Sequence, residues 1–407
     1  MKLNNKRTIL VGFAFFLICA FWQIYDVTIA MTLTSKFGMS QTASGVVMAL
    51  DNILALFMLP LFGGISDRHK SKHGRRTPFI RTGTILAVVF LMLLSLADNA
   101  QLAKIHDYSA VNDPATMERI YDEQKDATLK TPEGVEFKLA DIYTREEFAQ
   151  LTTDSTTTER NSFGREVEVN LYTRHVVPAR QACAAAVTDQ NPMTLVIFLG
   201  ILLMLLISMA TFRTPAVALM PDVTLKPLRS KANAIINLMG ALGGIIYLII
   251  TTFLYKTSSD VYVSYLPLFG IVGGIMLLAL AVVMFCVNEP KLVAEQRKYE
   301  EAHPEENLTT VTENGEELPR DVKRSLSFIL VSIALWFIAY NGVSTWFSVY
   351  ASASWNMSLG QANTCLTIAT AGAIVTYIPS GAIASKIGRR KTIRLGSLLL
   401  TTAFASA

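Results

Sequence analysis

The chain has 407 residues, of which 51% are hydrophobic and only 17% are charged, and its formal net charge is +4 at pH 7. A soluble protein has about a quarter of its residues charged, so this composition excludes an ordinary soluble globular protein. The small positive charge lies in segments expected to face an anionic membrane surface and does not indicate nucleic-acid binding.

Apolar stretches of about 20 residues, the length that a helix needs to cross a bilayer, recur along the chain. They predict an all-α membrane protein with nine spanning helices, at residues 8–32, 42–66, 78–97, 193–213, 232–255, 266–287, 327–350, 361–387 and 392 to the end. The first stretch is too long, too aromatic and too polar for a cleaved signal peptide.

Positive charge predicts which ends of these helices face inward. With the amino terminus inside, 24 of the 36 Lys and Arg residues lie in inward-facing segments. The short outward loops hold Lys36 and Lys256, and the remaining cations lie in one long outward segment, where charge has little effect on orientation. We therefore expect a multi-pass protein of the cell membrane with a cytoplasmic amino terminus.

The order of these stretches predicts five parts. Helices 1–3 occupy residues 1–97, an extracytoplasmic insertion 98–192, helices 4–6 residues 193–287, a cytoplasmic linker 288–326, and helices 7–9 residues 327–407. This gives an N-terminal bundle of six helices and a C-terminal bundle of which about three are present. A second half built like the first needs three more helices, so the chain looks truncated.

The two polar parts have predicted elements of their own. In the insertion we expect helices at 114–127 and 144–151, strands at 136–139 and 166–171, and a loop at 152–158. The insertion is either a lid or a decoration without function. The acidic, lysine-rich linker predicts a solvated segment with an amphipathic helix at 291–301.

One short basic motif occurs twice, each time between two predicted helices. The first copy is GGISDRHKSKHGRRTPF, from Gly63 to Phe79, and the second is GAIASKIGRRKT, from Gly381 to Thr392. Two copies in corresponding places indicate two membrane halves built alike, which is typical of secondary transporters. Glycine allows close helix approach, and the arginines suit an anionic inner leaflet. The motif is either a latch that closes one face of a transporter or a positively charged inner loop without a gating role.

These residues resemble the loop motif of the major facilitator superfamily, and SDRHKSKHGRRTPFI is most similar to proton-coupled sucrose transporters and the glycoside–pentoside–hexuronide symporters. RTPAVALMPDVTLKPLRSKANAIINLMGALGG, from Arg213 to Gly244, supports this resemblance. It implies the major facilitator fold, rocker-switch alternating access, and an inner gate in which Asp67 and Arg213 are partners. Ser385 replaces the acidic residue in the second copy, which implies a weaker latch there. The candidate gate residues are Gly63, Asp67, Arg68, Gly74, Arg75, Arg76, Arg213, Asp222, Arg229, Gly381, Gly388, Arg389 and Arg390.

Two acids, Asp26 and Asp51, lie well inside predicted spans, and no Lys, Arg or His does. At 1.5 Å per residue both lie roughly 10–15 Å below the outer helix ends. A carboxyl group there is costly, at about 2.5–3.5 kcal/mol on insertion scales, and such groups often mark ion pathways. Both are candidate coupling sites for H⁺, with Asp51 preferred and Na⁺ as the alternative ion. The structural alternative is a hydrogen bond between helices, for instance to Asn52 or Tyr25.

A substrate would lie between the halves, where aromatic faces with amide and hydroxyl groups suit a sugar. The candidate cavity residues are Trp22, Tyr25, Asn52, Asn233, Asn237, Trp336, Tyr340, Asn363, Thr367 and Tyr377. Each has the alternative role of an interfacial anchor or a packing residue. A helix break is expected at Asn341-Gly342, and plain helix packing at Gly240 and Gly244.

The sequence thus predicts a monomeric secondary transporter in the lipid bilayer that takes up a sugar or glycoside with protons. It predicts no cofactor and no metal site, and no enzyme, because no catalytic triad or phosphate-binding loop is present. The alternatives are proton-coupled efflux of a small organic compound, and a receptor or sensor whose ligand module is the insertion.

Overall fold

The computed structural model describes residues 3–132, 134–160, 166–255, 262–302, 320–355 and 359–406. The chain divides into two compact units: Met1–Thr157, Asn170–Gln296 and Tyr377–Ala407 form the first, and Thr158–Val169 and Arg297–Thr376 the second. Seven helical segments in the described part are long and apolar enough to cross a membrane.

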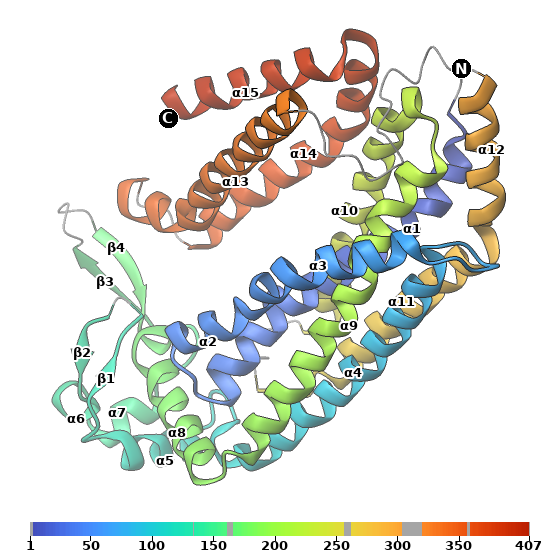
Figure 1. Cartoon of the computed structure of the whole chain (residues 1–407). Coiled ribbons are helices and arrows are strands. Elements are labelled where there is room, and N and C mark those ends of the chain that lie inside the picture. The colour runs from blue at the N-terminus through green and yellow to red at the C-terminus, as the bar shows by residue number, and fades with distance from the viewer. Residues whose placement is uncertain are drawn as a thin grey trace. The chain divides into compact units, whose positions relative to one another are not determined.

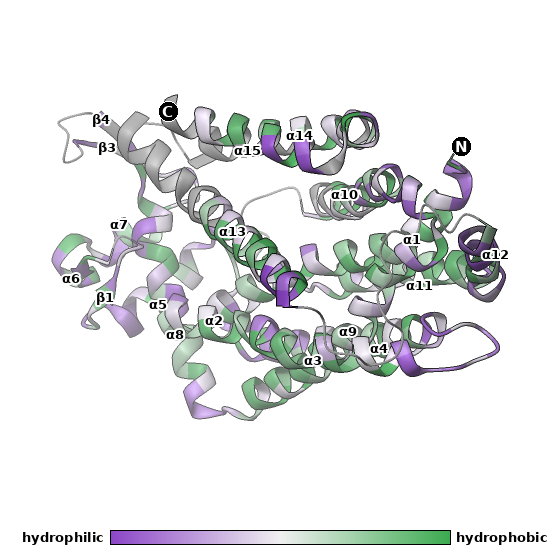
Figure 2. Ribbon diagram, turned by 45° about the horizontal axis from the view of Figure 1, so that its top comes forward, coloured by the Kyte–Doolittle hydropathy of each residue, from purple (hydrophilic) through white to green (hydrophobic). Residues whose placement is uncertain are grey.

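The first unit contains a helical bundle (Figure 1). Its helices are α1 (Asn5–Gln23), α2 (Gln41–Met48), α3 (Leu50–Arg68), α4 (Thr77–Lys104), α9 (Met193–Val223), α10 (Arg229–Leu254) and α11 (Leu266–Cys286). Helix α1 packs against α9, α10 and α11, and α9 packs against α3 and α4. The bundle helices are mostly apolar, whereas α12 (Glu289–Ala302) and the loop before α4 are mostly polar (Figure 2).

Close packing between α1 and α10 depends on small residues. A side chain at Gly240 would meet Phe15 and Cys19, and one at Gly243 would meet the backbone of Phe16. Gly244 faces Gln23 at ordinary contact distance. The packing role expected for Gly240 and Gly244 is confirmed, because helices without a Cβ at the interface can approach closely.

The first predicted span is not a uniform α-helix. After α1 the chain continues as two π-helical segments, η1 (Ile24–Ile29) and η2 (Thr32–Lys36). Asp26 lies in the first of them and Lys36 in the second. Short π-helical stretches are frequent at functional sites.

Two spans are longer than their apolar runs predict. Helix α4 continues to Lys104 instead of ending at 97, and α9 continues to Val223 instead of ending at 213. The added turns include Asp98 and Asp222, which form ion pairs with basic residues. The helices continue past the apolar runs because these charges are compensated.

The insertion has its own small core, formed by Met117, Ile120, Leu139, Phe148, Val176 and Cys183 with their neighbours. Its elements are α5 (Pro114–Gln124), β1 (Leu129–Lys130), β2 (Glu136–Phe137), α6 (Leu139–Ile142), α7 (Arg145–Ala149), β3 (Thr156–Arg160), β4 (Glu166–Asn170), η3 (His106–Tyr108), η4 (Tyr172–Val176) and α8 (Val177–Gln190). Both predicted helices and both predicted strands are present. The loop predicted at 152–158 is wrong at its end, where β3 begins, and α8 was not predicted.

The remaining helices are α12, α13 (Arg320–Trp355), α14 (Leu359–Ile387) and α15 (Arg389–Ser406). Helix α12 confirms the helix predicted at 291–301, and residues 303–319 of the linker lie outside the described residues. The break expected at Asn341-Gly342 is wrong, because α13 continues through it. Helices also form at the last two predicted spans, but α14 and α15 are not among the seven apolar candidates. Basic residues occupy the first turns of α15 and shorten its apolar run.

Candidate functional site

The two copies of the basic motif share one backbone feature. In the first, Gly74 lies between α3 and α4 with φ of 102°, and in the second, Gly388 lies between α14 and α15 with φ of 89°. Residues with a side chain rarely adopt a positive φ, because their Cβ atom clashes with the backbone, whereas glycine adopts it freely. The repeated glycine therefore makes the same kind of turn in both copies.

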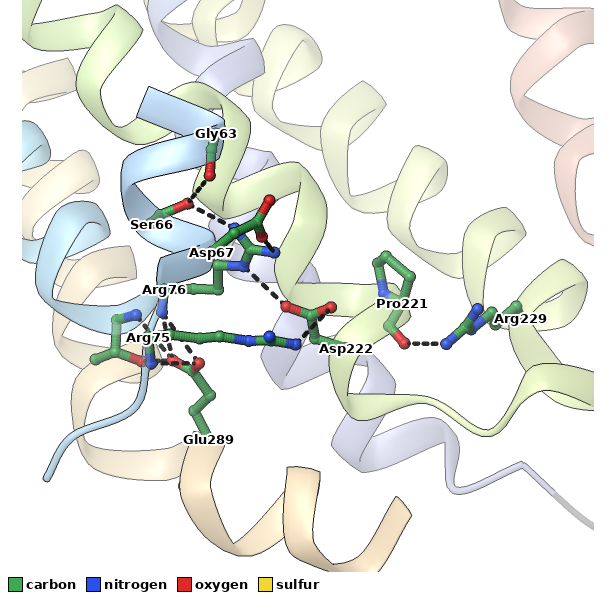
Figure 3. Close-up of polar contacts among 10 residues, drawn as sticks. Gly63, Ser66, Asp67, Arg75, Arg76, Pro221, Asp222, Arg229 and Glu289 are labelled. Atoms are coloured by element: carbon green, nitrogen blue, oxygen red, sulfur yellow. Dashed lines mark hydrogen bonds and ion pairs between the residues drawn. The ribbon is translucent and has the colours of Figure 1, made fainter. Parts of the chain in front are cut away.

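Arg76 is the centre of the polar contacts around the first copy (Figure 3). Its side chain is 6% exposed, its Nε donates to Asp222 Oδ2 at 2.8 Å, and its Nη2 forms an ion pair with Asp67. Nη1 donates to Ser66 Oγ, which donates in turn to the carbonyl of Gly63 at 2.9 Å. One guanidinium group thus connects the ends of α3 and α9 to the start of α4.

The charge of Arg76 is stable in this setting. Burial acts to lower the pKa of its guanidinium, but the hydrogen bonds and charges of Asp222 and Asp67 outweigh burial, so the pKa lies above its ordinary value. Arg75 adds a second ion pair to Asp222, with its Nη2 3.4 Å from Oδ1. Asp222 thus binds two guanidinium groups, those of Arg75 and Arg76.

Glu289, at the start of α12, caps α4 from outside that helix. Its carboxylate accepts hydrogen bonds from the backbone amides of Arg75 at 2.8 Å, Arg76 at 3.0 Å and Thr77 at 2.8 Å, and from Thr77 Oγ1 at 2.8 Å. An acid stabilises a helix amino terminus because the first amides there lack backbone partners. Sequence analysis missed Glu289, although an acid placed directly after span 6 and before Pro290 was a usable signal.

The pairing of Asp67 with Arg213 is wrong, because Arg76 is the ion-pair partner of Asp67. Arg213 lies ten residues before the end of α9, and its guanidinium lies 4.9 Å from the ring centroid of Trp22. Arg229, another candidate gate residue, donates to the carbonyls of Pro221 at 2.7 Å and Thr224 at 3.2 Å. Its hydrogen bonds therefore hold the α9–α10 turn.

The second copy has a different local environment. Ser385, which replaces the acid, donates to the carbonyl of Ala382 at 2.7 Å. A side chain at Gly381 would meet Ala234 of α10, whereas the space around Gly388 is open. Arg390 of the second copy is exposed, as is Arg68 of the first, and the side chain of Arg389 lies outside the described residues. The second copy forms no ion pair in the described part of the chain, whereas the first pairs Arg76 with Asp67.

Gly74 leads to a stability prediction. Alanine there would have an unfavourable φ, at about 1–3 kcal/mol, and its Cβ would also overlap the carboxylate of Glu289. We expect Gly74→Ala to lower the free energy of unfolding by more than Gly388→Ala, which has the same backbone cost but no neighbour within 4 Å. Denaturant titration in detergent micelles measures both, with the helical and unobstructed Gly64→Ala as the control. Equal losses for the two variants would contradict a structural role for Glu289.

A second group of charged residues lies within the bundle. Asp51 and Arg213 line one small pocket together with Trp22, and its volume of about 10 Å³ is close to that of a single water molecule. The carboxyl groups of Asp26 and Asp51 also interact electrostatically. Because α9 continues ten residues beyond Arg213, this residue lies inside a helix that is long enough to span the membrane. The expectation that no basic residue lies well inside a span is wrong for Arg213.

The aromatic residues of the first span pack around this pocket. The rings of Trp22 and Tyr25 meet edge to face with centroids 5.3 Å apart, and the Tyr25 hydroxyl donates to the carbonyl of Met48 at 2.9 Å. The indole N–H of Trp22 is buried and has no hydrogen-bond partner among the described residues. Asp26 and Asn52 are exposed. The hydrogen bond suggested between Asp26 and Tyr25 is thus replaced by one from Tyr25 to the backbone.

The other cavity candidates fall into three sets. Asn233, Asn237 and Tyr377 line one pocket of about 460 Å³ in the first unit. Trp336 and Tyr340 stack at 5.8 Å on α13 in the second unit. The side chains of Asn363 and Thr367 lie outside the described residues.

A buried ion pair at the opposite end of the bundle was not predicted. Lys36 Nζ lies 2.7 Å from Asp98 Oδ2, and both side chains are 0% exposed. Lys36 Nζ also donates to the carbonyl of Val263 at 2.8 Å and lies 3.9 Å from the ring centroid of Tyr265. Sequence analysis placed Lys36 in an outward loop and Asp98 in the insertion. Two opposite charges, one at the outer end of span 1 and one at the outer end of span 3, were the available signal.

The ion pair is connected to the insertion by hydrogen bonds. Gln101 Nε2 donates to the backbone carbonyl of Lys36 and to Thr188 Oγ1, each at 3.0 Å. Thr188 belongs to α8, and Thr194 at the start of α9 donates to Gln101 Oε1 at 2.8 Å. The insertion is thus attached to the bundle through buried polar groups.

Comparison with known families gives a match over most of the chain. The family model described as Major Facilitator Superfamily matches residues 11–105 and 179–407. The unmatched interval contains most of the insertion. No curated protein and no solved structure matches the chain.

Proposed function

The chain belongs to the Major Facilitator Superfamily of membrane transporters, and we propose that it takes up a sugar or glycoside together with protons by alternating access. It is a multi-pass membrane protein with a small-molecule substrate. The further assignment to the branch of the sucrose/proton and glycoside–pentoside–hexuronide symporters is part of the proposal.

The observation that carries the proposal is the Asp51 carboxyl group in the bundle beside Arg213 and Trp22. A carboxyl group with a nearby guanidinium can change its proton occupancy when the surrounding access to water changes. Intramembrane carboxyl groups serve as proton relays in transporters. Asp51 is therefore the proposed coupling residue, with Asp26 as a second carboxyl group in electrostatic contact with it.

The Arg76 cluster supports alternating access. We propose that Arg76, Asp67 and Asp222 form a latch that holds one end of the bundle closed. The positive charges of the loop between α3 and α4 support a cytoplasmic position for this end by the positive-inside rule. The amino terminus would then be cytoplasmic.

Amide and aromatic groups support a sugar as the substrate. Asn233, Asn237 and Tyr377 line a single pocket of about 460 Å³, a size within the range of small-molecule sites. Amides bind hydroxyl edges of a sugar, and an aromatic ring packs against its apolar face. We propose that these three residues contribute to substrate binding.

Uptake in reconstituted vesicles tests the proposal. Vesicles that contain the full-length protein are supplied with a panel of radiolabelled mono- and disaccharides while an external pH electrode records proton movement. Proton-coupled uptake predicts alkalinisation of the external medium when a transported sugar is added. Acidification of that medium when the substrate enters would indicate exchange of substrate for protons and favour proton-coupled efflux instead. No sugar movement under any gradient would overturn the sugar assignment.

A further inference from the structure

A second pocket of about 460 Å³ lies at the end of the bundle that carries the Gly74 loop. Three chain segments form its wall: the loop at residues 69–73, the first turns of α4, and the junction of α11 with α12 at residues 284–290. The pocket is separate from Asp51 and Arg213 and from the pocket lined by Asn233, Asn237 and Tyr377.

Basic side chains dominate the charge of this pocket. His69, Lys72, His73 and Arg81 line it, and all four are exposed. None of them forms an ion pair within the described residues. The acid in the wall is Glu289, but its side chain is buried and its carboxylate is occupied by the amides at the start of α4. Lys72 and Arg81, which form no ion pair among the described residues, therefore line a pocket whose carboxylate is already engaged by other groups.

The same wall has an unusually exposed apolar part. Phe285, in the last turn of the apolar helix α11, is 89% exposed, and Met284 and Cys286 lie beside it in the wall. On the neighbouring helix α4, Ile85, Leu86 and Val89 are exposed above the basic residue Arg81. The basic residues at the helix end suit the phosphate headgroup of a phospholipid. The apolar surface that follows along the helix suits its acyl chains.

We propose that this pocket binds the phosphate headgroup of an anionic phospholipid, whose acyl chain packs against Phe285. Basic pockets between transmembrane helices bind such headgroups because each nearby Lys or Arg attracts the anionic phosphate. A free phosphate ion would engage the basic residues alone, whereas a lipid would engage the phenyl ring as well. The exposed ring is the reason to choose the lipid.

Native mass spectrometry of the full-length protein in detergent tests the proposal. The protein is mixed with phosphatidylglycerol or with phosphatidylcholine, and the bound fraction of each lipid is measured. We expect phosphatidylglycerol to be retained preferentially, and the double variant Lys72→Gln/Arg81→Gln to bind it on the order of thirtyfold more weakly, since each charge contributes about a factor of five. The matched control Lys70→Gln/Lys291→Gln removes two exposed cations near the same end that do not line the pocket.

A second pair of variants distinguishes a lipid from a soluble anion. Phe285→Ala is expected to weaken phosphatidylglycerol binding severalfold, whereas Phe253→Ala, which removes another highly exposed ring, leaves it unchanged. Inorganic phosphate and glycerol 1-phosphate are added as competitors. Full displacement by either at equal concentration, together with normal lipid binding by Phe285→Ala, would overturn the lipid assignment in favour of a free anion.

Two other results would also overturn the proposal: equal retention of the two lipids, or equal loss in both double variants. Folding is checked by the elution volume and thermal midpoint of each variant. Arg81→Lys keeps the charge and is expected to retain binding, which separates a lost charge from a damaged fold.

Discussion

Replacing Asp98 with asparagine is expected to lower the free energy of unfolding by about 3–5 kcal/mol, because removal of one partner from a buried ion pair leaves an uncompensated charge. The Lys36 ammonium group would then lie in a fully buried site with the carbonyl of Val263 and the ring of Tyr265 as its remaining strong contacts. Denaturant titration in detergent micelles, followed by circular dichroism, measures the loss.

The double variant Lys36→Met/Asp98→Leu provides the decisive comparison. Well-packed apolar residues often replace a buried ion pair at little cost, so we expect the double variant to recover most of the stability lost by Asp98→Asn. The exposed pair of Lys130 and Glu136 is the control, and its removal is expected to cost about 0–1 kcal/mol. A loss of that small size for Asp98→Asn would contradict the burial of the Lys36–Asp98 pair.

Asp51→Asn is expected to abolish pH-driven accumulation of substrate while downhill exchange persists. Coupling requires a group that carries a proton in one orientation and releases it in the other, and an amide cannot do so. One pH unit is worth about 1.4 kcal/mol, which sustains about a tenfold concentration ratio for one proton per substrate. The variant is expected to reduce this ratio to one, measured with a radiolabelled substrate in vesicles under an imposed pH gradient.

Companion variants assign the role among the charged residues of this site. Asp51→Glu keeps a carboxyl group and is expected to retain partial accumulation. Asp26→Asn tests the second carboxyl group that interacts with Asp51. Retained accumulation in Asp51→Asn with loss in Asp26→Asn would transfer the coupling role to Asp26, and retention in both would contradict coupling through either residue.

The helices were largely predictable because their signals are local. A run of apolar residues predicts a span wherever it occurs, and the predicted helices at 114–127, 144–151 and 291–301 correspond to α5, α7 and α12. The helix ends were less predictable. Asp98 and Asp222 lie in helical turns that hydropathy places outside the spans, and α9 continues ten residues beyond Arg213, where its predicted span ends. Hydropathy counts the cost of a charge but does not include the partner that compensates it.

The candidate site was also only partly predictable: the sequence indicated its residues but not their contacts. Arg76 and Asp67 were recognisable as candidates from the repeated motif, and Asp222 from the resemblance of the stretch between Arg213 and Gly244, but their pairing was not. The resemblance assigned Arg213 to Asp67, whereas the structure pairs Asp67 with Arg76. Arg213 instead lies beside Trp22 and Asp51, a position that depends on how α9 packs against α1 and α3.

The amino-acid sequence by itself determined that this protein is helical, that it is built for a membrane, and that the motif containing Gly74 recurs at Gly388. These properties depend on hydrophobicity over one helix length and on the backbone freedom of single glycines, which neighbouring residues are enough to establish. Only the tertiary structure decided that Glu289 caps α4, that Arg76 joins three helices, and that Lys36 and Asp98 neutralise each other. An ion pair or a cap depends on a few ångströms between groups that can lie more than 200 residues apart, and helix packing alone determines that distance.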